Sequence, residues 1–356
     1  MQYFTFISGF FFLTLMFNST KPIKEQVYIY YFIVIFVALA IGLRGNDDEY
    51  TRIYVIIPTL EDFFSGNHAI INAKGWIFGF ISSFFRTLNF NSQSIFLFFS
   101  SSAVFLHAFF FRKYTKYYFL AFLLYLSHEI AFKEWVGLRM GFASALLLPM
   151  IYYLEQGKKI KFFILVVIAT LIQYVAILSF LLYFLNRKIK PKYLLFGLFI
   201  SILLAKFHIV YNFVWFLDSA NIVPDIASSY LGYQVYVYDT GLSHAKTIQQ
   251  IITLLVLIFL FGYKINTSKS YNLLFHAYYL STIFYITFSE LALFAFRFGG
   301  HFYSVEPILL TYIVTTFKQR SIAANVIASI SLIAAYLNYV VMERVSPYIL
   351  FVNDST

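Results

Sequence analysis

Twelve apolar segments follow one another along this chain of 356 residues, with short polar connections between most of them. A membrane-spanning helix needs about 20 mainly apolar residues, and most of the segments approach that length. Only 12% of the residues are charged, whereas a soluble domain carries roughly 25%. The pattern predicts an all-α polytopic membrane protein that forms a single integral domain over residues 1–356. The segments cover residues 2–18, 27–43, 75–88, 94–111, 117–131, 136–154, 162–185, 193–215, 247–263, 271–289, 301–317 and 321–342.

The basic residues predict which connections face the cytoplasm, because cytoplasmic loops of membrane proteins are enriched in Lys and Arg. Six short connections hold 16 of the 26 Lys and Arg residues but only two of the 16 acidic residues. They contain Lys21 and Lys24; Arg112, Lys113 and Lys116; Lys158, Lys159 and Lys161; Arg187, Lys188, Lys190 and Lys192; Lys264 and Lys269; and Lys318 and Arg320. The net charge of +10 is therefore a topology signal, and we expect no nucleic-acid partner.

All six connections lie on the cytoplasmic side if two of the apolar segments do not cross the membrane. The segment 75–88 is about 14 residues long, which is short for a span. The segment 162–185 lies between two basic clusters and has Gln173 at its centre, which predicts a re-entrant hairpin that breaks near Gln173. The preferred topology has about ten crossings with both termini outside, and outer loops at about 44–93 and 216–246. Twelve complete crossings are the alternative.

Charged side chains are costly within a membrane, so those near the predicted outer face are the candidate functional residues. They form three groups: Arg44 with Asp47, Asp48, Glu49 and Tyr50; Arg139 near the start of a span; and Glu290, Arg297, His301 and Glu306, where the chain is expected to turn between two spans. A lone arginine at a helix end also fits a simpler role as an interfacial anchor. Glu306 lies inside an apolar segment, so it needs a partner, for which Arg297 and His301 are the nearest candidates.

The longest outer loop is rich in tyrosine, including Tyr233, Tyr236 and Tyr238. A tyrosine combines a flat apolar face with a hydroxyl, which suits stacking on sugar rings, although an aromatic interface loop would have the same composition. The chain has no cysteine, which excludes disulfides and thiolate metal sites. Its histidines lack the i, i+4 spacing of a zinc site, and we predict neither a metal nor a cofactor.

Three stretches carry a resemblance to a known family. The run Arg44–Pro58, with its Asp-x-Tyr and Arg-Ile-Tyr elements, is similar to the first outer loop of Wzy-type O-antigen and capsular polysaccharide polymerases, in the EpsG-like branch. Leu138–Ala145 resembles that family's arginine-centred start of a span, and Arg297–Glu306 resembles its late arginine. The chain departs from the family at Gln173, where a histidine is frequent, and at Lys74, where an acidic residue is common.

The resemblance implies a glycosyltransferase that polymerises polysaccharide repeat units in the bacterial inner membrane, with its active site facing the periplasm or exterior. Such an enzyme transfers the growing glycan from undecaprenyl diphosphate to a lipid-linked repeat unit. Both lipid-linked oligosaccharides are therefore expected partners, and a chain-length regulator and a flippase are candidate partners.

The resemblance also implies roles for individual residues. Arg139 and Arg297 are expected to bind the diphosphate, because the guanidinium fork matches phosphate oxygens. Arg44 is expected either to join them at the diphosphate or to orient the acidic loop that follows it. Tyr50 is expected to contact the sugar together with the three tyrosines of the long outer loop. The acceptor hydroxyl must lose a proton to a nearby base. Asp48 is the first choice for that base, and the further candidates are His301, Glu290 and Glu306.

Two other functions remain open from the sequence. One is a different membrane glycosyltransferase with a lipid-linked donor, either a ligase or a metal-dependent GT-C type enzyme that uses Asp47 and Asp48. Dependence on a divalent cation would indicate the metal-dependent enzyme. The other is a flippase or transporter for lipid-linked oligosaccharides. Transporters commonly contain matched halves, and no convincing internal repeat is present in the sequence.

Overall fold

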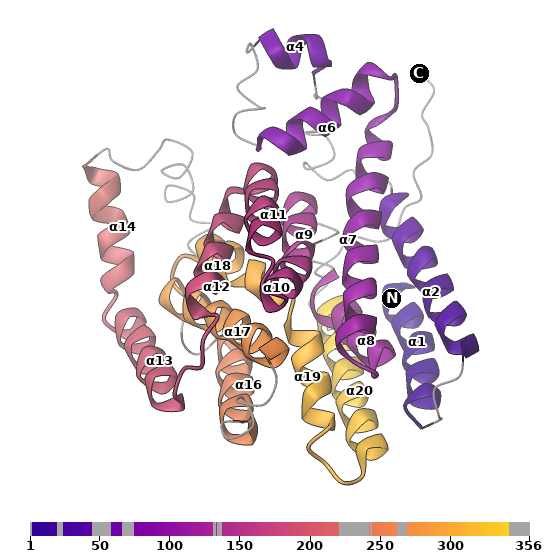
Figure 1. The fold of residues 1–356 in the computed structure, drawn as a ribbon, viewed down its shortest axis with the longest axis vertical. Helices are drawn as coiled ribbons and strands as arrows, with labels where there is room; N and C mark the ends of the chain where they lie inside the picture. The colour runs from indigo at the N-terminus through magenta and orange to yellow at the C-terminus, as the bar shows by residue number, and fades with distance from the viewer. Residues whose placement is uncertain are drawn as a thin grey trace. The chain divides into compact units, whose positions relative to one another are not determined.

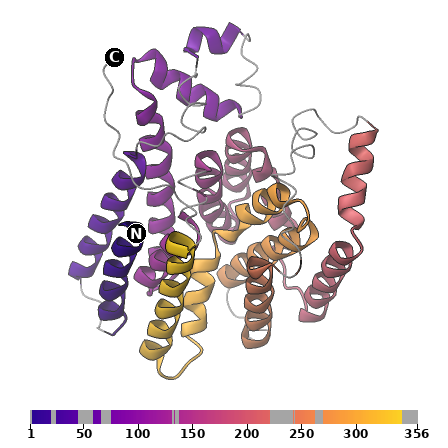
Figure 2. The same ribbon diagram turned by 180° about the vertical axis from the view of Figure 1, so that it is seen from behind.

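The computed structural model describes residues 2–19, 24–44, 58–65, 75–130, 133, 137–220, 242, 244–261 and 269–341. Within these residues the secondary structure is helical and contains no β-strand, which confirms the predicted all-α fold (Figures 1 and 2). Contacts divide the chain into two compact units. The first comprises Met1–Pro149, Val167–Tyr174 and Pro307–Thr356, and the second comprises Met150–Val166 and Val175–Glu306.

The first unit contains most of the N-terminal helices together with the last two. These are α1 (Gln2–Ser19), α2 (Lys24–Gly42), α4 (Leu60–Ser65), α6 (Trp76–Thr87), α7 (Ser92–Tyr114), α8 (Tyr118–His128), α9 (Leu138–Ala145), α19 (Glu306–Val314), α20 (Arg320–Tyr336) and the π-helical turn η4 (Leu337–Val341). Two further helices, α10 (Leu147–Glu155) and α11 (Lys159–Ile172), are shared between the units.

Helices α2 and α7 pack closely along their length (Figure 1). Gly42 permits this approach at the end of α2, since a Cβ there would lie 2.8 Å from the Cα of Leu97. Further along the interface, the buried Tyr30 hydroxyl donates to the carbonyl oxygen of Ala108 at 3.0 Å. The Tyr30 ring also packs on Tyr118, with ring centroids 4.8 Å apart. Aromatic side chains therefore form much of the core where α2, α7 and α8 meet.

The segment 75–88 forms α6, which lies across the end of α7 (Figure 1). Its 12 residues span about 18 Å, well short of the ~30 Å hydrocarbon core. Gly75 precedes the helix with a φ of 94°, and a Cβ there would lie 2.5 Å from the carbonyl oxygen of Ile172. The short α6 therefore agrees with the prediction that this segment does not cross, and Gly75 fixes its start against the end of α11.

The second unit contains the 3-10 helix η2 and the helices that follow it. These are η2 (Tyr174–Phe180), α12 (Leu181–Leu185), α13 (Pro191–Lys206), α14 (Ile209–Ser219), α16 (Ala245–Phe261), α17 (Lys269–Thr287) and α18 (Ala292–Tyr303). Helix α17 contacts α12, α13, α16 and α18, so it forms the centre of the unit. At the α17–α18 contact, the Ser281 hydroxyl donates to the carbonyl oxygen of Gly299 at 2.8 Å.

The segment 162–185 breaks where the sequence predicts. Helix α11 ends at Ile172, and η2 begins after Gln173. A straight helix would separate Lys159 from Tyr183 by about 36 Å, yet the Lys159 ammonium donates to the Tyr183 hydroxyl at 3.3 Å. The chain therefore doubles back, which confirms the predicted hairpin shape of this segment.

In the described part of the chain, three helical stretches are long and apolar enough to cross a membrane: Lys24–Gly42, Gln93–Tyr114 and Arg320–Val341. The pair α13 and α14 would be a fourth, although it is bent by 57°. The predicted apolar segment 193–215 is divided into α13 and α14 at His208, which adopts a left-handed φ of 55° and so ends a helical run. The chain is a multi-pass membrane protein, and the number of ten crossings stays a prediction.

A cysteine in place of Lys188 tests the membrane orientation of the hairpin, in a chain that has no native cysteine. Lys188 is exposed between α12 and α13. We expect an impermeant thiol reagent to label Lys188→Cys only after the cells are permeabilised, because a re-entrant hairpin keeps both flanking basic clusters in the cytoplasm. Ser219→Cys, at the end of α14, is the control and should be labelled in intact cells. Labelling of Lys188→Cys in intact cells would exclude a re-entrant hairpin.

Candidate functional site

Arg44 is held rigidly at the end of α2, in the first unit. Its side chain is only 4% exposed, and its guanidinium donates to the carbonyl oxygen of Ile41 at 2.9 Å. The guanidinium also lies over the ring of Phe96, 5.1 Å from the ring centroid. The Gln93 amide donates to the carbonyl oxygens of both Gly42 and Arg44. The first turns of α7 therefore fix both the backbone and the side chain of Arg44.

Arg139 reaches the same part of α7 from the start of α9. Its guanidinium lies 5.7 Å from the ring centroid of Phe78, and the Phe78 ring packs on Phe99 with centroids 4.7 Å apart. Phe99 and Phe96 are three residues apart on α7 and are therefore neighbours on its surface. The first unit thus places Arg44 over Phe96 of α7 and Arg139 over Phe78 of α6, which packs on α7 through Phe99. We call these five residues the arginine–phenylalanine patch.

Several of the sequence-predicted site residues lie outside the described residues. They are Asp48 and Tyr50 of the first outer loop and Tyr233, Tyr236 and Tyr238 of the long outer loop. Their proposed roles as base and sugar contacts stay predictions. Among the described residues, no group of three His, Cys, Asp or Glu side chains could hold a metal ion.

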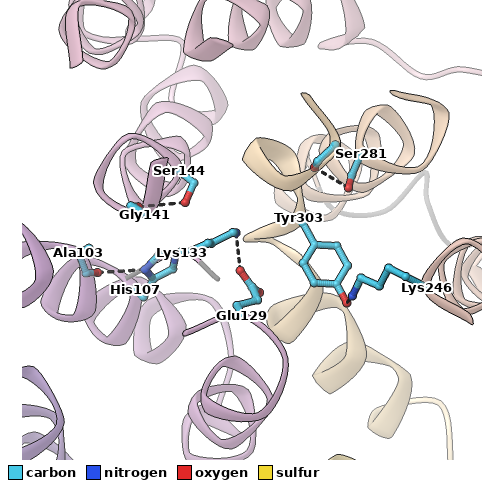
Figure 3. A network of polar contacts seen from close by, with 10 residues as sticks. Ala103, His107, Glu129, Lys133, Gly141, Ser144, Lys246, Ser281 and Tyr303 are labelled. Atoms are coloured by element: carbon cyan, nitrogen blue, oxygen red, sulfur yellow. Dashed lines mark hydrogen bonds and ion pairs between the residues drawn. The ribbon is translucent and has the colours of Figure 1, made fainter. Parts of the chain in front are cut away.

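A buried ion pair joins α8 to the residues that precede α9. The Lys133 ammonium lies 2.5 Å from the Glu129 carboxylate, and both residues are almost completely buried (Figure 3). Nearby, the ring of His107 stacks on Tyr125 with centroids 4.6 Å apart, which makes His107 a core residue. This pair was not predicted from the sequence. The i, i+4 spacing of a Glu at the end of one apolar segment and a Lys just before the next could have indicated it.

In the second unit, Arg297 and His301 belong to helix α18. The sequence analysis expected a turn here, and this is wrong because Gly299 packs inside the helix. A Cβ on Gly299 would lie 2.9 Å from the carbonyl oxygen of Ser281, so the glycine serves a close helix contact. One helical turn separates Arg297 from His301, which places both on one face of α18. The buried His301 ring pairs with the Ser179 hydroxyl of η2 at 2.7 Å.

Glu306 is the last residue of the second unit; it is completely buried and begins α19. Its carboxylate accepts hydrogen bonds from the Gln249 amide at 3.3 Å and from the Tyr278 hydroxyl at 3.4 Å. Gln249 also donates to the Tyr303 hydroxyl, which accepts a second hydrogen bond from Lys246 (Figure 3). A connected polar network therefore surrounds Glu306, formed by residues that the sequence analysis did not single out. The i, i+3 spacing of Lys246 and Gln249 at the start of an apolar helix could have indicated these residues from the sequence.

Glu290 lies in the short connection between α17 and α18. Its carboxylate contacts the Nδ1 atom of His208, the left-handed residue that separates α13 from α14. The contact gives Glu290 a structural role in holding the bent pair, beside its predicted role as a candidate base.

Comparison with known proteins identifies the family of this chain. The sequence model of the EpsG family matches residues 27–352. The chain belongs to the EpsG family. The family resemblance drawn from the motifs around Arg44, Arg139 and Arg297 is thereby confirmed.

A curated relative of this EpsG-family protein is the "Amylovoran biosynthesis protein AmsC" of Erwinia amylovora. It is 26% identical over 352 residues, which cover 92% of this chain and 90% of the relative. No solved structure is significantly similar to the chain. The region that matches the EpsG model includes every candidate residue from Arg44 to Glu306. The arginine–phenylalanine patch and the network around Glu306 therefore both lie within the matched region.

Proposed function

We propose that this EpsG-family protein is a polysaccharide polymerase of the Wzy type. It transfers a growing glycan from undecaprenyl diphosphate to a lipid-linked repeat unit at the outer face of the bacterial inner membrane. Membership of the EpsG family carries this proposal, and the relative named for amylovoran biosynthesis supports the substrate class. The fixed arginines of the first unit supply the chemistry that the reaction needs.

The leaving group of this reaction is a diphosphate, which gains negative charge as the glycosidic bond breaks. An arginine that is already oriented can stabilise this charge without reorganising. Arg44 is held by Ile41 and Phe96, and Arg139 lies over Phe78 in the same patch. We assign both to the diphosphate of one lipid carrier. Arg297, on the same face of α18 as His301, is assigned to diphosphate binding from the second unit.

A base must remove the proton from the acceptor hydroxyl as the new bond forms. Asp48 remains our first candidate. Among the described residues, His301 is the strongest, because its pairing with Ser179 orients the ring. Glu306 already accepts two hydrogen bonds and Glu290 contacts His208, so these two carboxylates fit structural roles better.

Arginine-to-alanine variants test the assignment in a strain that lacks the native gene. We expect Arg139→Ala and Arg297→Ala each to reduce long-chain polysaccharide roughly 100-fold, the loss typical of removing one preorganised charge-stabilising group. The readout is the ladder of chain lengths on a gel, normalised to the amount of protein in the membrane. Arg139→Lys should recover part of the activity, because it restores the charge but not the planar fork.

Arg112→Ala is the matched control. The guanidinium of Arg112 lies over the ring of Tyr31, 5.6 Å from its centroid, in a predicted cytoplasmic connection. This variant should therefore keep its full ladder. Normal ladders from both Arg139→Ala and Arg297→Ala would reject the diphosphate assignment. Failure of the purified wild-type protein to extend any defined lipid-linked repeat unit would count against the polymerase itself.

A further inference from the structure

A cavity of about 480 Å³ lies within the first unit, between α1, α2, α8 and η4. Its walls are apolar and include Phe6, Ile7, Val37, Ile41, Leu126 and Tyr339. The volume lies within the range of roughly 300 to 1,000 Å³ that is typical of small-molecule sites. No residue assigned above to catalysis or to the diphosphate lines this cavity.

The wall formed by η4 is held in place by hydrogen bonds to α8. The Tyr339 hydroxyl donates to the carbonyl oxygen of Leu126 at 2.7 Å, and the Asn338 amide donates to that of Ser127 at 2.9 Å. Single π-helical turns such as η4 are rare and are frequent at functional sites. The cavity is therefore preformed, with Tyr339 as a fixed aromatic wall.

One side of the cavity is bounded by exposed apolar side chains of α2. Phe36 is 53% exposed and Leu39 is 44% exposed, and both line the cavity. Helix α2 is one of the stretches long enough to cross a membrane, so these side chains face hydrocarbon when α2 spans the bilayer. An apolar chain can thus enter sideways from the lipid.

A positive charge lies next to the lining residues at the end of α2, although it does not itself line the cavity. Arg44 directly follows Leu43, a lining residue, and its guanidinium donates to the carbonyl oxygen of Ile41, another lining residue. Because Arg44 is nearly buried, an anion that reaches it must leave the membrane surface and enter the protein. The site therefore suits a molecule with one apolar chain and a compact, multiply charged head.

We propose that this cavity binds the isoprenoid chain of a polyprenyl diphosphate, with its diphosphate at Arg44. The proposal rests on the proposed function, which requires such a carrier, and adds the place where its lipid lies. The cavity selects the carrier from bulk phospholipid because only the carrier combines a single chain with a diphosphate that the buried guanidinium can bind.

Photocrosslinking of the purified full-length protein in lipid nanodiscs tests the site without requiring catalysis. The probe is a polyprenyl diphosphate with a photoreactive group near its first isoprene units. We expect crosslinks on α1, α2 and α8, mapped by mass spectrometry. Unlabelled undecaprenyl diphosphate should reduce them at least tenfold, undecaprenol should compete weakly, and phosphatidylglycerol should not compete. Equal competition by phosphatidylglycerol would overturn the proposal, because it would indicate ordinary boundary lipid.

Two variants that fill the cavity locate the crosslink. Ala40→Trp and Leu39→Trp add bulk at lining residues, and each should lower the competed crosslink at least fivefold. Leu39 is exposed, so its variant should fold even if Ala40→Trp does not. Ile35→Trp is the control, since Ile35 is exposed on the same helix but does not line the cavity. Crosslinks that survive in a folded Leu39→Trp protein would overturn the proposal.

The crosslinking and polymerisation experiments distinguish a failure of the lipid-site proposal from a failure of the polymerase proposal. Competed crosslinks in a protein that extends no repeat unit would reject the polymerase and keep the cavity as an isoprenoid site. Ladders made by a protein that gives no competed crosslink at α1, α2 or α8 would reject the cavity and keep the polymerase. Arg44→Ala should abolish the preference for the diphosphate over undecaprenol, and an unchanged preference would reject the role of Arg44.

Discussion

Replacing Lys133 with methionine is expected to lower the free energy of unfolding by about 3 to 5 kcal/mol, the usual cost of removing one partner of a buried ion pair. Lys133 and Glu129 are both almost completely buried and lie 2.5 Å apart. The substitution leaves the Glu129 carboxylate in an apolar region without the ammonium group. Denaturant unfolding of the purified protein in detergent micelles, followed by tryptophan fluorescence, measures the change.

The double variant Glu129→Met/Lys133→Met is the matched control. It removes both charges and keeps similar side-chain volumes, so it should recover most of the lost stability. A double variant that is stable but makes no polysaccharide would indicate that the pair serves the reaction, for example by fixing the approach to Arg139. A single variant as stable as the wild type would contradict the ion pair as described.

Replacing Gly75 with alanine is expected to destabilise the protein by roughly 2 to 5 kcal/mol. This range adds about 1 to 2 kcal/mol for a left-handed residue with a Cβ to about 1 to 3 kcal/mol for overpacking. Gly75 has a φ of 94°, and its added Cβ would lie 2.5 Å from the Ile172 carbonyl oxygen and 2.8 Å from that of Leu171. The contacting atoms are backbone, so they cannot move aside as a flexible side chain could.

Gly9→Ala is the control for Gly75→Ala. Gly9 lies inside α1, and apart from its chain neighbours and the nearby backbone of α1 no atom lies within 4 Å of the position its Cβ would take. An alanine there should be neutral or stabilise the protein by up to about 1 kcal/mol, because glycine is a poor helix residue. Thermal unfolding of the two variants in the same nanodiscs compares them directly. Equal unfolding temperatures for the two would contradict the close packing of α6 against the end of α11.

The sequence predicted the outcomes that depend on local composition and periodicity. The break after Ile172 followed from two basic clusters that flank one apolar segment with Gln173 at its centre. The short α6 followed from the number of apolar residues. The turn expected around Arg297 was wrong, because close packing on Ser281 keeps Gly299 in a helix.

By itself, the sequence determined that this protein is an all-helical, multi-pass membrane protein with short motifs of the EpsG family, since a bilayer imposes segment length and composition on each stretch separately. The tertiary structure decided which polar residues meet. Arg44 lies over Phe96 of α7 and Arg139 lies over Phe78 of α6, and Glu306 takes its hydrogen bonds from Gln249 and Tyr278. These pairings join residues far apart in the chain, and they follow from how whole helices pack, which no local pattern encodes.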